Sequence, residues 1–216
     1  MGTDKPKQFI DIEGVPILQR SISLFTDALP GIKVITVLPL DCKEAWKEYC
    51  LTRNFGQPQT LVEGGFTRFH SVKNALGRVP DGVIVAIHDG VRPLVSEGLI
   101  SSMAAVMAAG NCHALVPVTP ITDTLKCLSV GSDGRFIDEG EADRSRLFGA
   151  QTPQFFLSED IKKAYSQPYD TSFTDDASVA RRAGIPLRFC EGERLNIKIT
   201  CPDDLLIARA VLGGRN

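Results

Sequence analysis

Several features that would assign the chain to a membrane, an export pathway or nucleic acid are missing from its sequence. No apolar run approaches the ~20 residues that a membrane-spanning helix requires. The polar start, MGTDKPKQF, lacks the apolar centre of a secretory signal peptide. A net charge of −2 gives no strong positive field to attract nucleic acid or an anionic membrane surface. These absences predict a cytoplasmic protein that binds neither nucleic acid nor a membrane.

The usual patterns of covalent, metal and dinucleotide chemistry are also absent. The six cysteines are scattered, with no Cys-x-x-Cys pair and no metal-ligand spacing, so we interpret them as reduced thiols of the core or the surface. They are Cys42, Cys50, Cys112, Cys127, Cys190 and Cys201. The sequence has no Ser-His-Asp order, no Cys-His pair, no paired carboxylates typical of a glycosidase and no GxGxxG motif. The last absence argues against a dinucleotide-binding oxidoreductase.

What the sequence does contain is a regular alternation of apolar runs and amphipathic stretches. The runs at 32–38, 82–88 and 113–118 are continuous, as expected for strands buried on both faces. Their repeated alternation with helical stretches predicts a doubly wound α/β fold with a mainly parallel sheet, in one domain spanning residues 1–216. Helices are expected from Pro16, at 43–53, 69–78, 96–109, 158–165 and 175–183, and near Pro202, with a further strand at 187–190.

The segment from about 124 to 149 departs from this alternation. DTLKCLSV and RFIDEG are strand-like and flank the turn sequence GSDG, which predicts a β-hairpin. Because an isolated two-stranded hairpin is only marginally stable, we expect this protruding arm to pack against another surface.

Two groups of polar residues follow predicted strands, where open α/β sheets bind their ligands. In IHDGVRPLV, Asp89 can hold a divalent metal and Arg92 offers a forked cation to phosphate, although a surface Asp–Arg pair would look the same. In EGGFTRFHSV, the paired glycines have N–H groups suited to a nucleobase or phosphate, and Arg68 and Ser71 open a helix. His70 is more typical of packing.

Four further segments carry polar residues of interest. AQTPQFF (150–156) suits a rigid wall with a hydroxyl and an amide, or a simple proline turn. In FTDDASV (173–179), Thr174 can cap a helix whose first turn explains both aspartates without a function. Lys198 lies in the apolar NIKIT segment, predicted as a strand, and so should face an anion; Lys7 precedes a short predicted strand.

Together these segments supply many cations, few acids and no nucleophile. The cations are Lys7, Arg68, Arg92, Arg144 and Lys198, and Asp89 is the candidate metal ligand. Phosphoryl and nucleotidyl transfer need this composition, because they depend on positioning and charge neutralisation more than on covalent help.

The ordered set of motifs resembles one enzyme family. PKQF, GG-x-x-R-x-x-SV, HDGVRPLV, PVTPITDTLK, AQTPQFF, TDDASV and NIKITCPDDL occur in the order seen in 2-C-methyl-D-erythritol 4-phosphate cytidylyltransferases. The resemblance runs from Met1 to about Ala210, and the full set is specific although no single motif is. It implies a Rossmann-like nucleotidyltransferase sheet and a hairpin arm that joins two subunits into a homodimer.

The resemblance also implies a reaction and roles for particular residues. An oxygen of methylerythritol phosphate attacks the α-phosphorus of CTP, and pyrophosphate leaves, in the synthesis of isoprenoid precursors; Mg²⁺ or another divalent cation is the expected cofactor. Lys7 and Lys198 match the catalytic lysines. Gly64, Gly65, Arg68, Ser71, Asp89 and Gly90 match nucleotide-binding positions. Asp89, Arg92, Thr124, Arg144, Thr152 and Thr174 match positions around the polyol phosphate, with Arg144 reaching the partner's site.

Two alternative functions share many of these features. A ribitol-5-phosphate cytidylyltransferase has most of the motifs, but TDDASV and DTLK look closer to the methylerythritol enzymes. A catalytically impaired nucleotide-binding homologue is the other, because the family opens with a strand and a glycine-rich triphosphate loop that this sequence lacks. The retained Lys7, Asp89, Arg92 and Lys198 argue against it. Since the loss of a first strand would expose apolar neighbours and unpaired backbone groups, we expect the biological chain to begin about 20 residues upstream of Met1.

Overall fold

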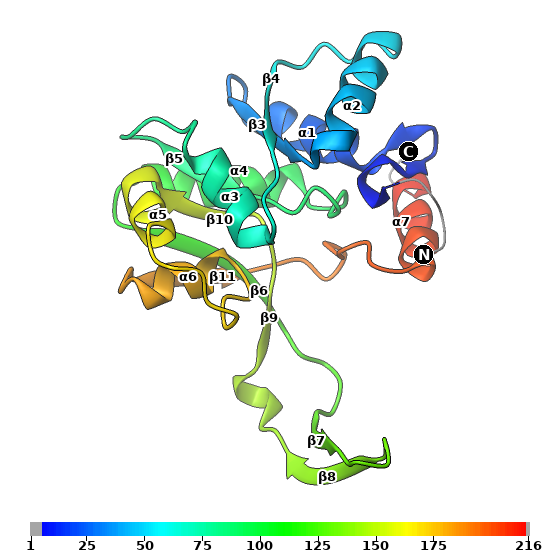
Figure 1. The fold of residues 1–216 in the computed structure, drawn as a ribbon, viewed down its shortest axis with the longest axis vertical. Helices are drawn as coiled ribbons and strands as arrows, with labels where there is room; N and C mark the ends of the chain where they lie inside the picture. Colours follow the sequence, from blue (N-terminus) through cyan, green and yellow to red (C-terminus); the bar gives the residue numbers. More distant parts are fainter. Residues whose placement is uncertain (1–5, 215–216) are drawn as a thin grey trace.

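The computed structural model describes residues 6–214 and contains the expected alternation of strands and helices (Figure 1). Its main strands are β3 (Val34–Leu38), β4 (Gln59–Glu63), β5 (Ile84–Ile87), β6 (Ala114–Pro120), β9 (Phe148–Ala150), β10 (Gln154–Leu157) and β11 (Leu187–Glu191). Its helices are α1 (Ile17–Ala28), α2 (Leu40–Thr52), α3 (Arg68–Leu76), α4 (Glu97–Ala108), α5 (Ser158–Tyr165), α6 (Asp176–Arg182) and α7 (Pro202–Gly213).

The central sheet has the strand order β11-β6-β10-β5, with β9 added to β6. Strands β5, β6 and β11 run in one direction, and β10, between β5 and β6, runs in the other. Strands β3 and β4 form a separate parallel pair. The predicted Rossmann-like sheet with mostly parallel core strands is therefore confirmed, with β10 as a reversed strand.

Consecutive residues of the sheet point to opposite faces and bury two hydrophobic layers. Phe156 packs with α3, α5 and α6, whereas Phe155 packs with α1 and α4. Both rings are buried, and each contributes roughly 1.5–3 kcal/mol relative to an exposed ring. Helices cover both faces, so the ends and free edges of the strands rather than the faces are open to a ligand.

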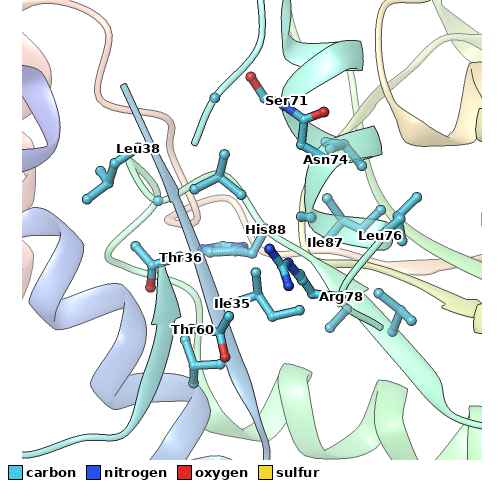
Figure 2. Close-up of a pocket in the computed structure, with 18 of the residues that line it drawn as sticks. Ile35, Thr36, Leu38, Thr60, Ser71, Asn74, Leu76, Arg78, Ile87 and His88 are labelled. Carbon is cyan, nitrogen blue, oxygen red and sulfur yellow. The ribbon is translucent and has the colours of Figure 1, made fainter. Parts of the chain in front are cut away.

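A groove of about 1370 Å³ separates the β3–β4 pair from the central sheet. Among the described strands, β3 pairs only with β4 and β5 pairs only with β10. Figure 2 shows Thr36 and Leu38 on one side of the groove and Ser71 and Asn74 on the other, with His88 between them. The groove has apolar walls, and polar residues gather at the end of β5.

Several local predictions are confirmed, and two are wrong. Ser96 caps α4 through its side chain, as predicted, and Pro202 begins α7. The cap of α6 is Asp175 rather than Thr174, because the Asp175 carboxylate accepts the hydrogen bond from Ser178 N. Residues 196–200 do not form the predicted strand. Lys7 does precede a short strand, as predicted, and lies in a 3-10 helix (Lys7–Phe9). A short strand, β1 (Asp11–Ile12), follows that helix and pairs with β2 (Val15–Pro16).

The predicted hairpin forms an arm that extends away from the body of the molecule (Figure 1). It consists of β7 (Lys126–Val130) and β8 (Phe136–Glu141), which pair antiparallel. A 3-10 helix, Arg144–Arg146, follows β8 and leads back to the sheet. Along residues 6–214, no helix is long and apolar enough to cross a membrane.

Candidate active site

The candidate site is centred on Asp89, which follows β5 at the polar end of the groove. Its carboxylate is largely buried, with 13% of the side chain exposed. Arg68 Nε donates to Asp89 Oδ1 at 3.3 Å, and Lys198 Nζ lies 3.0 Å from Oδ2. Arg92 Nε lies 3.7 Å from Oδ2, within ion-pair range but too far for a hydrogen bond. Three cations from distant parts of the chain therefore meet at one carboxylate.

These contacts keep Asp89 ionised. Burial opposes its negative charge, but Arg68, Lys198 and Arg92 together lower the pKa of Asp89 below its ordinary value. For Arg92 the charged form is disfavoured instead. Burial, together with repulsion from Arg68, lowers the pKa of its guanidinium, although the nearby Asp89 carboxylate acts to raise it. Arg68 is also paired with Asp176, so the three cations face two carboxylates and leave one positive charge in surplus beside the groove, which suits a site for phosphate groups.

A chain of hydrogen bonds holds the backbone of Asp89 from behind. Asp89 N donates a hydrogen bond to Thr152 Oγ1 at 3.0 Å. The Thr152 hydroxyl can then donate its own proton to His88 Nδ1, which lies 3.1 Å away. His88 Nε2 then donates to Arg92 O at 3.1 Å. Burial lowers the pKa of His88 to about 4, so the ring is neutral at physiological pH and serves as a fixed spacer.

This arrangement changes how the Thr152 segment is interpreted. The sequence suggested a wall that presents a hydroxyl and an amide to a ligand. Thr152 and Gln154 are instead at most 5% exposed, and the Thr152 hydroxyl points toward His88 and Asp89. Its direct contact with a substrate remains a prediction, whereas its contact with Asp89 is present in the structure.

The glycine loop lies on the same groove, but its N–H groups are not free. Gly64 N donates to Leu38 O at 2.9 Å, and Gly65 N donates to Ser71 Oγ at 3.0 Å. Both N–H groups are therefore already used within the protein, and their contact with a ligand stays a prediction. Close packing explains Gly65, because a Cβ there would lie 2.4 Å from His70 Cβ. Ser71 fixes the loop by donating to Thr67 O at 3.0 Å.

The two candidate lysines approach one segment of the chain. Lys7 Nζ donates to Thr200 O at 2.9 Å, two residues beyond Lys198. The same segment is anchored by buried Asn196, whose Nδ2 donates to Thr152 O at 2.9 Å, and by Arg92 Nη1, which donates to Asn196 O at 2.7 Å. Residues 196–200 thus form an irregular segment rather than the predicted strand, and this segment places Lys198 beside Asp89.

Three predicted residues lie apart from this cluster. Thr124 and Arg144 are exposed at the arm, and Arg144 Nη1 donates to Thr122 O at 2.7 Å. Thr174 borders a small cavity of about 30 Å³ beside Arg68. Gly90 does join the site: it lies on the groove, where a Cβ would approach Leu18 Cδ1 to 3.1 Å.

The candidate site offers one carboxylate, that of Asp89, to a divalent metal ion. Within residues 6–214, no group of three or more His, Cys, Asp or Glu side chains could hold a metal ion. Mg²⁺ commonly binds through one or two carboxylates together with substrate phosphates. Asp89 fits that pattern, provided that the phosphates supply the remaining ligands.

Comparison with known proteins identifies the family of the chain. The model of the family described as 2-C-methyl-D-erythritol 4-phosphate cytidylyltransferase matches residues 1–214. The chain belongs to this family. The family member of Porphyromonas gingivalis is 42% identical over 213 residues, covering 98% of this chain and 91% of the relative. That of Bacteroides thetaiotaomicron is 39% identical, with 98% and 93% covered. The crystal structure of the Francisella tularensis cytidylyltransferase superimposes with a TM-score of 0.79 at 28% identity, covering 96% of this chain and 93% of the other.

In this cytidylyltransferase, sequence reasoning missed the groups that orient the site residues. They are His88, Asn196 and Asp176, of which Asn196 and Asp176 are buried and His88 is half-buried. Asp176 was explained as a first-turn helix acid, which it is, yet it also binds Arg68. No local signal in TDDASV indicated this buried partner.

Proposed function

We propose that the groove at Asp89 is where this cytidylyltransferase transfers CMP from CTP to 2-C-methyl-D-erythritol 4-phosphate. The products are the CDP-linked polyol and pyrophosphate, and the reaction belongs to isoprenoid precursor synthesis. The single observation that supports the site most strongly is the meeting of Arg68, Lys198 and Arg92 at Asp89, on the groove lined by the glycine loop.

This transfer reaction needs cations that neutralise phosphate charge, and it does not need a general base. The nucleophile is a phosphate oxygen of the polyol phosphate, which is already ionised and gives up no proton. Its oxygen forms a bond to the α-phosphorus of CTP, while the bond from that phosphorus to the oxygen bridging to the β-phosphate breaks. Negative charge accumulates on the α-phosphate and on the departing pyrophosphate, so fixed cations lower the barrier.

We assign that stabilisation to Lys7 and Lys198. Lys198 is 44% exposed on the groove and is held at Asp89 by an ion pair that a phosphate oxygen can exchange for a new one. Lys7 is exposed, and among the described residues its ammonium has one hydrogen-bond partner, the carbonyl of Thr200, which leaves it further donors for a ligand. Both lysines are therefore available to an incoming triphosphate.

A divalent cation, most simply Mg²⁺, is proposed as the cofactor. Asp89 would hold it together with the phosphates, because a single carboxylate suits a metal that is shared with the substrate. When bound, it neutralises charge on the triphosphate.

The remaining binding residues are assigned by their position relative to the groove. Gly64, Gly65, Ser71 and Gly90 line it and are proposed to form the nucleotide side, with Arg68 and Asp89 at its polar end. The polyol phosphate is assigned to Arg92, Thr124, Arg144, Thr152 and Thr174. Of these, Arg92 is the residue already at Asp89.

A homodimer through the arm is proposed from the arm's own composition. Phe136 is 76% exposed, and Leu128, Val130, Ile137 and Phe148 are also at least half exposed. An extended two-stranded hairpin with so much exposed apolar surface needs a partner to cover it. Arg144, which follows β8, would then be carried to the other subunit. We also infer a cytoplasmic location, because all six cysteines are free thiols.

Pyrophosphate release in the presence of CTP tests the proposal. We expect release with 2-C-methyl-D-erythritol 4-phosphate, and far less with ribitol 5-phosphate as the acceptor. Faster turnover with ribitol 5-phosphate would overturn the assigned acceptor, and release with neither would overturn the function.

A further inference from the structure

Asp176 is a charged residue without solvent exposure. It lies in the first turn of α6, and its relative exposure is 0%. Arg68 Nη1 donates to its Oδ1 at 2.9 Å and Nη2 donates to Oδ2 at 2.6 Å, which makes a two-pronged ion pair. Tyr165 Oη donates a further hydrogen bond to Oδ1 at 2.5 Å. A buried carboxylate needs such complete pairing, because its desolvation costs several kcal/mol.

The same guanidinium bridges Asp176 to the candidate site. Both terminal nitrogens of Arg68 are used by Asp176, and only Nε is directed to Asp89. Because the guanidinium is a rigid planar fork, fixing its two outer donors also fixes the direction of the third. Burial opposes the charge on Arg68, but the Asp176 carboxylate raises the pKa of Arg68 above its ordinary value, so the bridge stays charged.

The chain on both sides of Asp176 is held in place by the sheet. Gln154 on β10 donates from Nε2 to Asp175 Oδ2 at 2.8 Å and accepts from Ala177 N at 2.8 Å. The residues on both sides of Asp176 are therefore tied to one strand. The bridge runs from this fixed point through Arg68 to the end of β5.

We propose that Asp176 is a positioning residue for the reaction, which acts by orienting Arg68 so that it engages only one oxygen of Asp89. This inference rests on the proposed function. Without the Asp176 charge, the two outer donors of Arg68 are free to turn to Asp89 and take both carboxylate oxygens. Oδ2 is the oxygen that now meets Lys198, so Arg68 would compete with Lys198 and with any ligand of Asp89.

Asp176→Asn tests this role, because it keeps the shape and a hydrogen-bond acceptor for Tyr165 but removes the charge. We expect kcat to fall roughly 10-fold to 100-fold, the scale of a displaced catalytic group, with much smaller changes in the two KM values. Tyr165→Phe is the matched control: it removes a hydrogen bond to the same carboxylate and leaves the ion pair. It should lower Tm and leave kcat near that of the wild type.

A double-mutant cycle separates positioning from simple stability. If Asp176 acts through Arg68, the double variant Arg68→Met/Asp176→Asn should have the same kcat as Arg68→Met alone. It should also have the higher Tm, since Arg68→Met alone leaves Asp176 buried without a cation. The double variant buries neither charge, so its comparison with Arg68→Met remains available if Asp176→Asn alone does not fold.

Two results would overturn the proposal: wild-type kcat in folded Asp176→Asn, or kcat losses that multiply in the double variant. The Tm half of the cycle needs no substrate. Additive Tm changes would therefore disprove the coupling even if the wild-type protein released no pyrophosphate, an outcome that contradicts the proposed function alone.

Discussion

At the scale of single residues, the site depends on how few of its cations are neutralised. Asp89 and Asp176 are the only acids that the described ion pairs place against Arg68, Arg92 and Lys198. One positive charge is thus left over at this cluster, and Lys7 adds another nearby through Thr200. The proposed reaction brings in a triphosphate and a monophosphate, which explains why the protein tolerates that imbalance.

The two lysines give the first prediction. Lys7→Ala and Lys198→Ala should each lower kcat by roughly 100-fold or more, because each removes a cation aimed at charge that develops in the transition state. Steady-state pyrophosphate release measures the effect. Lys162→Ala is the control, since Lys162 lies in a surface ion pair with Asp81 and should leave kcat unchanged. Near-normal kcat in Lys7→Ala would contradict the assignment of that residue.

Asp89 gives the second prediction, which concerns the metal. Excess chelator should abolish pyrophosphate release, and added Mg²⁺ should restore it, because Asp89 with substrate phosphates forms a site of hard oxygen ligands. Asp89→Asn should raise the Mg²⁺ concentration needed for half-maximal rate. Full activity in chelator would remove the metal from the mechanism.

At the scale of elements, the start of helix α7 links the fold to the site. Asp204 Oδ2 accepts hydrogen bonds from Thr200 N at 2.6 Å, Thr200 Oγ1 at 2.8 Å and Cys201 N at 2.8 Å. These hydrogen bonds lower the pKa of Asp204 from 3.8 to about 2. Thr200 is also the residue whose carbonyl holds Lys7, so the helix start and the lysine share one anchor.

This anchor gives the third prediction. Asp204→Ala should lower the free energy of unfolding by about 1 kcal/mol at neutral pH, as for other capping groups. Because the folded pKa is depressed, the contribution is complete above about pH 4 and is lost as pH falls toward about 2. Urea unfolding at pH 7 and pH 2.5 measures the difference between variant and wild type, which should shrink at the lower pH. Asp203→Ala, in the same turn, should lose less; a difference independent of pH would contradict the account.

Elements with a strong local signal could be predicted from the sequence. The helix from Pro16, the arm and the strand before Asp89 all have the expected places, since apolar periodicity and turn residues determine them locally. The strand predicted at 196–200 is absent because this segment is fixed by side chains distant in sequence, such as Arg92 and Gln151. Lys198 was identified correctly as a residue that faces an anion, although that anion in the structure is Asp89.

The candidate site was only partly predictable for the same reason. Strand ends located Asp89 and the glycine loop, but Asp176 lies 108 residues beyond its partner Arg68. Nothing local distinguishes a buried aspartate in a first helical turn from an exposed one. Only the packing of α3 against α5, which brings Tyr165 and Arg68 to Asp176, reveals its second role.

At the scale of the whole molecule, the arm is the feature that a single chain does not explain. It carries exposed apolar residues, leads into the segment that contains Arg144, and extends away from the body of the molecule (Figure 1). A symmetric dimer would place each arm against the other subunit and give both subunits the same contacts. If Arg144 then completes the partner's site, each active site is built from two chains.

Mixing two inactive variants tests this arrangement and gives the fourth prediction. Arg144→Ala and Lys7→Ala damage different chains of one site, so a mixed dimer has one site with both defects and one with neither. Random exchange in an equal mixture should therefore restore about one quarter of wild-type activity. Lys7→Ala mixed with Lys198→Ala is the control: both lysines lie on the body of one subunit, every site keeps a defect, and no activity should return.

Subunit exchange is verified by native mass spectrometry with one variant tagged. No recovery after verified exchange would place Arg144 within its own subunit's site or outside any site.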